Sequence, residues 1–475
     1  MAFGEAFAAL CADPYAEPMD ARLFVRLNDD EGLPGTLVEL TATQTVLDLT
    51  AIEQRREHDF GVVHAQAWKA QITNIDRELL SVTLKDCWAV VRAGFPVADE
   101  WETFAQGKIK RCQVSANGTV TIEVHDAVMD LIGATLTRTM RFQAYGWISP
   151  MEVEAKAANS KSWNPATNLV LNTPAAAVDE TFVIEFTSPT AYKVVLEDGD
   201  ESQTGTISAD KTIANAGGIS GIITIPAAGW STDSGAYATG DTFIFFTSAP
   251  RLPDTLTPIY MIKHLIEDVL GLEIYDVLTG AAYGTALYDD DYWSTHGEVA
   301  VSEGNYITGT FERGTSVAAM IQDALKMVHG SVYPTETGQV GLWVPVPSAS
   351  APLRLNGDFG QGPVEILENA TYEDLSDEAI RAVTYKYRTA DGGEASYTKI
   401  DPDAKPTTTR TAVVEIAWEC VGSRVKNMAD RYLMRFRDGL REYVCPTTLA
   451  GFAARIGSVV GITEGELGLA GKAAD

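Results

Sequence analysis

Alternating apolar and polar positions over residues 21–155 predict a run of short β-strands. The clearest pair is Lys108–Val114 and Thr119–Val124, which flank the step Asn117–Gly118. Asn-Gly is the strongest short signal for a tight turn between two antiparallel strands. After this hairpin the apolar spacing becomes helical and ends at Gly133. The pattern predicts a small β-barrel or sandwich that ends in one short helix.

Residues 156–252 differ in composition, since Asn, Thr, Ser, Ala and Gly dominate there and Lys and Arg are few. Several short strands separated by turn residues are typical of a β-sandwich. Helical patterns resume after Pro250, so we interpret the sandwich as an insertion. Its predicted strands are Thr181–Phe186, Tyr192–Leu196, Gly205–Ser208, Ile222–Ile225 and Asp241–Thr247.

Three helices are predicted beyond the inserted sandwich. The first covers Thr257–Leu270, with Thr257 as the N-cap and Pro258 at the first helical position. The second covers Thr315–His329 and is closed by Gly330, and the third covers Ser423–Leu440. Each has an apolar stripe along one side. The predicted strands around them are Ser331–Thr335, Gln339–Val346, Arg381–Arg388, Tyr397–Ile400, Arg441–Pro446 and Ala454–Thr463.

At 475 residues the chain is too long for one ordinary core. We predict a β-rich α+β multidomain fold with two small tube-like β-barrels, an α+β domain between them and an inserted β-sandwich. The predicted divisions are an N-terminal segment (1–20), the first barrel (21–155), the sandwich (156–252), the α+β domain (253–360) and the second barrel with its helix (361–475). We expect the second barrel to be incomplete at Asp475.

The charge balance narrows the classes of partner. The chain has 36 Lys and Arg against 65 Asp and Glu, a formal net charge of −29. Such a surface repels phosphate backbones, which disfavours sequence-independent nucleic-acid binding. It also disfavours docking on anionic membranes.

Compartment signals point to a protein made in a reducing environment. The cysteines are scattered, odd in number and never in a CxxC pair, which favours free thiols over disulfides or a zinc site. The N-terminus lacks a basic region, so we expect no signal peptide. The uncharged run Thr212–Thr232 is rich in Gly, Ser and Thr, and we interpret it as two strands and not as a membrane span. The cysteines are Cys11, Cys87, Cys112, Cys420 and Cys445.

Residues that usually carry metal chemistry are scattered. No two histidines occur at the i, i+4 spacing of a helical metal site. The acidic runs Asp289–Asp291 and Asp198–Glu201 lack the alternation that lets one loop wrap a calcium ion, so solvated loops are favoured. The six histidines are His58, His64, His125, His264, His296 and His329.

Catalytic motifs are equally weak. The chain has no nucleophile elbow, phosphate-binding loop or dinucleotide fingerprint, and Asp358–Gly360 spells a kinase-like Asp-Phe-Gly without its partner motifs. Nothing singles out a carboxylate pair for glycoside hydrolysis. We therefore predict no catalytic, cofactor-binding or metal-binding residue, and no enzyme.

The order of segments is more informative than any single residue. It runs through His64–Leu79, Gly107–Val114, Val120–Asp126, Phe311–Ala318 and Ala454–Thr463. This succession resembles that of the tail hub proteins (baseplate hub or tail tip) of long-tailed bacteriophages. One departure lies in the last segment, where Ser458 occupies the position at which the family usually has Asp.

The resemblance implies a structural hub at the distal end of a phage tail. Three copies would form a ring that adapts the six-fold tail tube to a three-fold tip and forms part of the DNA exit channel. The implied partners are further copies in a homotrimer, tail tube and distal tail ring proteins, and tip, spike or fibre proteins. DNA would pass through without specific binding, and no stable membrane association is implied. The implied location is the tail tip of the virion, after assembly in the host cytoplasm.

Two hypotheses follow from that resemblance. The excess of acidic residues would line the lumen and repel passing DNA. The inserted sandwich would face outward and contact fibres or the host surface. Its aromatic residues Trp230 and Tyr237 are candidates for stacking on sugars, although core packing is the commoner role of such residues.

Two other function classes stay open. One is a secreted or surface carbohydrate-binding or adhesion protein with a β-sandwich, which predicts a signal peptide, paired cysteines and a carboxylate-lined cleft. The other is a tail-associated cell-wall hydrolase, for which no segment of the sequence has the expected pattern.

Overall fold

The computed structural model describes most of the chain. The described residues are 20–29, 33–42, 46–49, 62–63, 67–73, 83–115, 118–126, 128–157, 161–196, 203–216, 218–232, 236–251, 256–272, 274–282, 293, 307–335, 337–344, 353–356, 364–365, 371–375, 379–404, 408–437, 440–444, 460–464 and 469–474.

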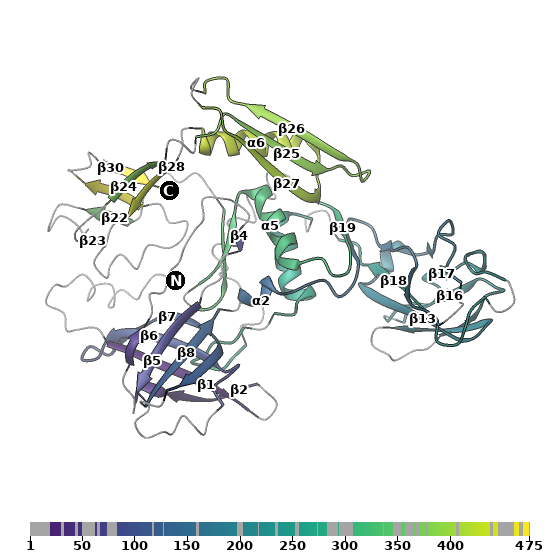
Figure 1. The fold of residues 1–475 in the computed structure, drawn as a ribbon, viewed down its shortest axis with the longest axis horizontal. Coiled ribbons are helices and arrows are strands. Elements are labelled where there is room, and N and C mark those ends of the chain that lie inside the picture. Colours follow the sequence, from purple (N-terminus) through teal and green to yellow (C-terminus); the bar gives the residue numbers. More distant parts are fainter. Residues whose placement is uncertain are drawn as a thin grey trace.

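Seven N-terminal strands form one antiparallel sheet that curls into a half-barrel, drawn in purple and blue in Figure 1. The strands are β1 (Asp20–Asn28), β2 (Pro34–Glu39), β3 (Val46–Leu49), β5 (Ala67–Thr73), β6 (Trp88–Phe95), β7 (Glu100–Val114) and β8 (Thr119–His125). Their hydrogen-bonded order is β2-β1-β6-β7-β8-β5-β3, and the 3-10 turn η1 (Leu40–Ala42) follows β2. Four strands separate β1 from β3 in that order, yet their Cα atoms come within 8 Å of each other. The sheet therefore curves back on itself.

The predicted Asn-Gly hairpin is confirmed as β7 and β8. Ser115 N donates to Thr119 O at 2.8 Å, and Gly118 has φ +79°, which a glycine adopts without strain. Alternate residues of β8 point into the half-barrel, as the period of two predicts. These fully buried residues are Val120, Ile122 and Val124.

Residues 147–248 form a module of two sheets with a core of its own, at the right of Figure 1. Its strands are β10 (Trp147–Ile148), β11 (Glu152–Ala155), β12 (Val170–Leu171), β13 (Glu180–Ser188), β14 (Ala191–Leu196), β15 (Gln203–Thr206), β16 (Lys211–Ile213), β17 (Ile223–Ile225) and β18 (Thr242–Ser248), with 3-10 turns η3 (Pro174–Ala176) and η4 (Ala227–Gly229). One sheet has the order β10-β18-β13-β14-β15, with β11 also paired to β18, and the other has the order β12-β17-β16. The chain enters and leaves at one point, because Trp147 and Ser248 are antiparallel partners.

The core of this inserted module is aromatic. The rings of Phe182 and Phe245, on neighbouring strands, are stacked with their centroids 4.7 Å apart. In β13 the buried residues alternate with partly exposed ones. The predicted strands of this region match β14, β17 and β18 to within one residue at each end, and β13 to within two, so these predictions are confirmed. The predicted strand Gly205–Ser208 is placed two residues too late, because β15 covers Gln203–Thr206.

A helical centre lies between the half-barrel and the C-terminal sheet (Figure 1). Its elements are β4 (Val62–Val63), α2 (Met129–Ile132), β9 (Met140–Phe142), α3 (Pro258–His264), the π-helical turn η6 (Leu265–Val269), β19 (Gly309–Phe311), α5 (Val317–Val328), β20 (Ser331–Pro334) and β21 (Val340–Trp343). Strand β9 pairs with β19, and β20 pairs with both β21 and the distant β4.

The ends of α3 and α5 can be compared with the capping residues that the sequence predicts. Thr257 caps α3 by accepting from Tyr260 N at 3.3 Å, as predicted, but the helix turns into a π-helix after His264. Ser316 caps α5 by accepting from Ala319 N. That helix ends at His329 in the left-handed region (φ +54°), one residue before the predicted Gly330.

The described residues of the C-terminal part form three sheets. Its elements are β22 (Leu353–Asn356), β23 (Val364–Glu365), β24 (Thr371–Leu375), β25 (Ala382–Arg388), β26 (Glu394–Ile400), β27 (Thr411–Glu419), α6 (Gly422–Phe436), β28 (Leu440–Val444), β29 (Val460–Glu464) and β30 (Leu469–Ala474). Strand β25 pairs antiparallel with β26 and parallel with β27, and α6 packs on this sheet. The sheet orders of the other strands are β23-β22-β29-β30 and β24-β28.

One hydrophobic core joins the half-barrel, the helical centre and the β25–β27 sheet. It runs from Trp88 on β6 through α3 and α5 to Tyr385 and Trp418. We call these connected parts the body, to distinguish them from the inserted module. A β-rich chain with few helices and several sheets was predicted, and over the described residues this is confirmed. The predicted domain boundaries, the two-barrel arrangement and the sandwich stay predictions.

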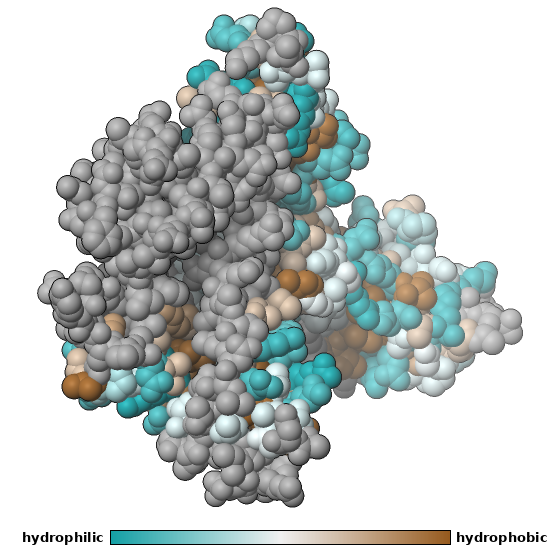
Figure 2. Space-filling model, turned by 60° about the vertical axis from the view of Figure 1, so that its left-hand side comes forward, coloured by the Kyte–Doolittle hydropathy of each residue, from teal (hydrophilic) through white to brown (hydrophobic). Residues whose placement is uncertain are grey.

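The described part of the surface is mixed in hydropathy. Figure 2 shows hydrophilic residues over most of the described part of one face, with smaller hydrophobic patches between them. Scattered exposed apolar residues are normal for a globular surface. No helix within the described ranges is both long and apolar enough to span a membrane.

Candidate functional site

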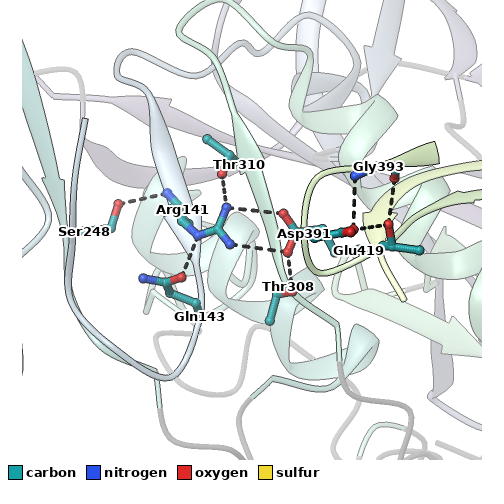
Figure 3. A network of polar contacts seen from close by, with 9 residues as sticks. Arg141, Gln143, Ser248, Thr308, Thr310, Asp391, Gly393 and Glu419 are labelled. Atoms are coloured by element: carbon teal, nitrogen blue, oxygen red, sulfur yellow. Dashed lines mark hydrogen bonds and ion pairs between the residues drawn. The ribbon is translucent and has the colours of Figure 1, made fainter. Parts of the chain in front are cut away.

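Arg141 lies on β9 at the point where the inserted module, β19 and β27 meet (Figure 3). Its Nη1 donates to Thr310 Oγ1 at 2.6 Å, and its Nε donates to Gln143 Oε1 at 2.5 Å. The guanidinium also faces both carboxylate oxygens of Glu419, at 3.2 and 3.4 Å. The planar fork of arginine suits this two-oxygen contact. Arg141 therefore ties two strands of the body together.

Glu419 ends β27 and is only 7% exposed. Besides Arg141 it accepts from Thr308 Oγ1 at 2.8 Å, and its backbone N donates to Thr308 O at 2.7 Å. The end of β25 lies next to it, because Cys420 N donates to Arg388 O at 2.8 Å. Figure 3 also labels Asp391 and Gly393 in the turn after β25, where Gly393 N donates to Asp391 Oδ1 at 3.3 Å.

The inserted module reaches the same cluster through Ser248. The backbone N of Arg141 donates to Ser248 Oγ at 2.9 Å, and Arg251 N donates to Gln143 O at 2.9 Å. We call Arg141, Gln143, Ser248, Thr308, Thr310 and Glu419 the polar joint. Its donors and acceptors bind one another, so the chemistry available here is the holding together of separate sheets.

A second arginine, Arg26, is buried and fastens the half-barrel to the helical centre. Arg26 Nε donates to Val277 O and its Nη2 to Leu278 O, both at 2.6 Å. The segment turns at Gly280 (φ +75°), where a Cβ atom would lie 2.7 Å from Arg26 Nη1. A larger residue at Gly280 would therefore be strained and would push against the arginine.

A polar groove of about 720 Å³ lies over the β25–β27 sheet, with α5 as one wall. Four of its ionic groups form pairs, Lys386 with Glu415 at 2.7 Å and Lys326 with Asp323 at 2.6 Å. Hydrogen bonding to Glu415 raises the pKa of Lys386 and lowers that of Glu415 in return. Both side chains are exposed, so this pair contributes little to stability.

Burial makes the described thiols poor nucleophiles. It raises the pKa of Cys420 to about 12, with Glu419 and Asp323 adding to the effect. The pKa values of Cys87 and Cys112 are also raised, in each case mainly by burial. A thiol needs a lowered pKa to react as a thiolate near neutral pH.

The candidate metal residues do not form a site within the described ranges. His125 lies 3.3 Å from Glu123, and the buried His329 contacts Tyr385 Oη at 2.9 Å. His264 lies beside Asp268 and Arg251. No group of three metal-ligating side chains occurs among the described residues. His58, His64, His296, Asp289–Asp291 and Asp198–Gly199–Asp200–Glu201 lie outside the described residues.

Trp230 and Tyr237 belong to the core of the inserted module. Their exposed fractions are 4% and 2%, and Tyr237 stacks on Phe186 with centroids 4.3 Å apart. The interpretation of these residues as core aromatics is confirmed, so they do not offer a sugar-stacking surface.

Sequence reasoning missed Arg141, Glu419 and Arg26. Each lies in a strand between apolar neighbours, as in Met140-Arg141-Phe142 and Trp418-Glu419-Cys420. A charged residue between apolar neighbours in a strand is the signal that could have identified them. Such a residue is expected to be buried, and a buried charge needs a partner of opposite charge or a hydrogen-bonding group.

Comparisons with known proteins find similar structures but no family. No family model and no curated protein matches the chain. A tail protein from Neisseria meningitidis MC58 has 10% sequence identity and a TM-score of 0.43, over 96% of this chain and 89% of that one. A 43 kDa tail protein of prophage MuSo2 from Shewanella oneidensis has 9% identity and a TM-score of 0.42, over 94% and 90%. The prophage tail protein gp18 from Listeria monocytogenes EGD-e has 7% identity and a TM-score of 0.37, over 96% and 87%.

Proposed function

We propose that this protein is a structural hub at the distal end of a phage tail, where three copies form a ring. Each copy would contribute two tube-like β-barrels, so the ring would present six similar units to the six-fold tail tube and three-fold symmetry to the tip. The proposal starts from the resemblance in segment order between this sequence and the tail hub proteins.

The observation that carries the proposal is the continuous core of the body. It holds the half-barrel and the β25–β27 sheet on opposite sides of one helical centre (Figure 1). A closed ring requires a fixed angle between the two surfaces through which each copy contacts its neighbours. Arg26 and the polar joint add directional bonds that oppose rotation of these parts. A building block of this kind acts through its shape, as a hub does.

The inserted module would face outward from the ring and contact fibres or the host surface. Two observations support that position: the module has its own core, and its chain enters and leaves at one point. The tail tube and distal tail ring proteins would bind on one side of the ring, and tip, spike or fibre proteins on the other. The location would be the tail tip of the virion.

The net charge of −29 supports a channel through which DNA passes without sticking. Replacement of lumen Asp and Glu residues by Lys is expected to slow genome ejection. Unchanged ejection kinetics in such variants would contradict an acidic lumen.

The mass of the assembled protein tests the ring. Native mass spectrometry of the full chain is expected to give three copies of the 51.2 kDa chain, about 154 kDa. A chain without the inserted module, residues 147–248 replaced by a short turn, is expected to form the same trimer. A monomer at all concentrations, both in solution and when recovered from particles, would refute the proposal.

A further inference from the structure

A second link between the inserted module and the body runs from Asp179 through Arg251 to His264, in the last turn of α3. The imidazole is 7% exposed and lies edge-on to Phe142 of β9, with ring centroids 5.8 Å apart. Its Nε2 lies 2.8 Å from Arg251 Nη2, and its Nδ1 lies 2.5 Å from Asp268 Oδ2. His264 is thus in contact with one basic and one acidic group at the same time.

Arg251 is the link between the module and this histidine. It follows β18 by three residues, and its Nη2 pairs with Asp179 Oδ2 of the module at 2.5 Å. Asp179 Oδ1 accepts from Ala249 N at 2.9 Å, which fixes the carboxylate at the base of the module. The contact between Arg251 and His264 therefore joins the base of the module to α3, whose buried face belongs to the core of the body.

The geometry fixes the protonation state of His264. A guanidinium has only donors, so Nε2 must accept from Arg251 and must carry no proton. Nδ1 then carries the proton and donates it to Asp268. A second proton can bind only at Nε2, where it would replace the lone pair that Arg251 uses and place two cations in contact.

The surroundings favour the neutral ring. Burial, and next the charge of Arg251, lower the pKa of His264 from its usual value, while Asp268 and Asp179 act in the opposite direction. These three are the charged groups that act on the ring among the described residues. The contact is therefore complete above pH 6.5 and is lost as the pH falls below that value toward the lower pKa of the folded state.

We propose that His264, Arg251 and Asp179 form a pH-sensitive latch, closed when His264 is neutral, that sets the orientation of the inserted module. Proton uptake at Nε2 opens the latch by breaking the bond to Arg251. The module keeps its own core and changes only its angle to the body. This inference concerns one chain and does not depend on the ring.

Other bonds limit the movement without preventing it. The module stays covalently attached, and Arg138 Nη1 donates to Asp179 O at 3.1 Å. Arg313 and Glu154 form a second bridge at 2.9 Å, but both side chains are exposed. Exposed ion pairs are weak, so this bridge resists the movement little.

The test measures the distance between the module and the body in the full chain. Spin labels attached through non-canonical amino acids at the exposed positions Thr204 (module) and Asn427 (α6) leave the native cysteines in place. Double electron–electron resonance from pH 7.5 to pH 4.5 is expected to show one narrow distance at neutral pH. Below pH 6.5 a second or broader distance is expected, while circular dichroism stays unchanged.

Three variants make the result specific. His264→Gln offers an amide oxygen to Arg251 but cannot take up a proton, so it is expected to keep the narrow distance at every pH. Asp268→Asn removes a charge that favours protonation, so the change is expected at lower pH than in the unmodified chain. His125→Gln, a matched replacement on the half-barrel, is expected to behave like the unmodified chain.

The inference fails if the unmodified chain keeps one narrow distance down to pH 4.5, or if His264→Gln responds to acid as the unmodified chain does. Loss of secondary structure at the same pH as the distance change would also overturn it, because the latch requires a local movement in a folded protein.

Discussion

Removing the carboxylate of Glu419 is expected to destabilise the body without affecting the inserted module. Glu419→Ala leaves the Arg141 guanidinium facing an empty space and takes the acceptor from Thr308 Oγ1. The side chains of Arg141 and Glu419 are 22% and 8% exposed, so water replaces the lost contacts only in part.

The magnitude follows from the bonds that are lost. Hydrogen bonds to charged groups contribute about 1.5–3 kcal/mol each, and the Arg141 contacts at 3.2 and 3.4 Å belong at the low end. Together with the loss of the Thr308 bond, we expect a cost of about 3 kcal/mol, at the lower limit for breaking a buried ion pair. The double variant Arg141→Met, Glu419→Leu leaves no charge unpaired. Its loss of stability is therefore expected to be about 2 kcal/mol smaller than the sum of the losses in the single variants Arg141→Met and Glu419→Leu.

Urea unfolding followed by pulsed hydrogen–deuterium exchange and mass spectrometry separates peptides of the body from those of the module. In Glu419→Ala the midpoint of the body peptides is expected to fall, while peptides of β13 and β18 keep theirs because their core is separate. The reasoning is refuted if the loss of stability in the double variant equals the sum of the losses in its two single variants. It is also refuted if Glu419→Ala destabilises the module as much as the body.

Three further predictions concern single positions. Gly205→Ala is expected to destabilise only the module, by about 1–3 kcal/mol in calorimetry, because the new Cβ would lie 2.6 Å from the Tyr192 ring; an unchanged module transition would contradict this. Burial lowers the pKa of His329 to about 3, so the neutral ring stabilises the body above pH 6.5 and this stabilisation falls with pH between 6.5 and about 3. His329→Asn, which tolerates the left-handed backbone and does not titrate, is expected to flatten that dependence by up to about 1.4 kcal/mol per pH unit in urea unfolding; an equal slope in both proteins would exclude His329 as its source. Cys420, with its pKa raised to about 12, is expected to resist iodoacetamide at pH 8 in the folded chain, and rapid alkylation detected by peptide mass spectrometry would show that the thiol is accessible.

Local features of this fold could be predicted from the sequence, because a few neighbouring residues determine them. The Asn117–Gly118 turn gave the β7–β8 hairpin, and Thr257 with Pro258 marked the start of α3. The end of α5 was placed one residue late. Gly330 was the expected signal for a left-handed end, but His329 adopts that conformation and is held by Tyr385.

Pairings between distant segments could not be predicted, because no local signal specifies the partner. Strand β9 pairs with β19 across 169 positions from Arg141 to Thr310, and β20 pairs with β4 across an even longer separation. Arg141 and Glu419 are 278 positions apart. The charge of each residue indicated that it needs a partner, but only the packing of the body decides which one.

The pairing of Trp147 with Ser248 has an evolutionary consequence. Antiparallel partners lie only about 5 Å apart, so the two ends of the inserted module are almost as close to each other as the ends of a tight hairpin. A single recombination event could therefore exchange the intervening stretch for a foreign one, or for a few linking residues, without altering any other strand. Lineages under pressure to recognise new surfaces would be expected to vary most at this seam.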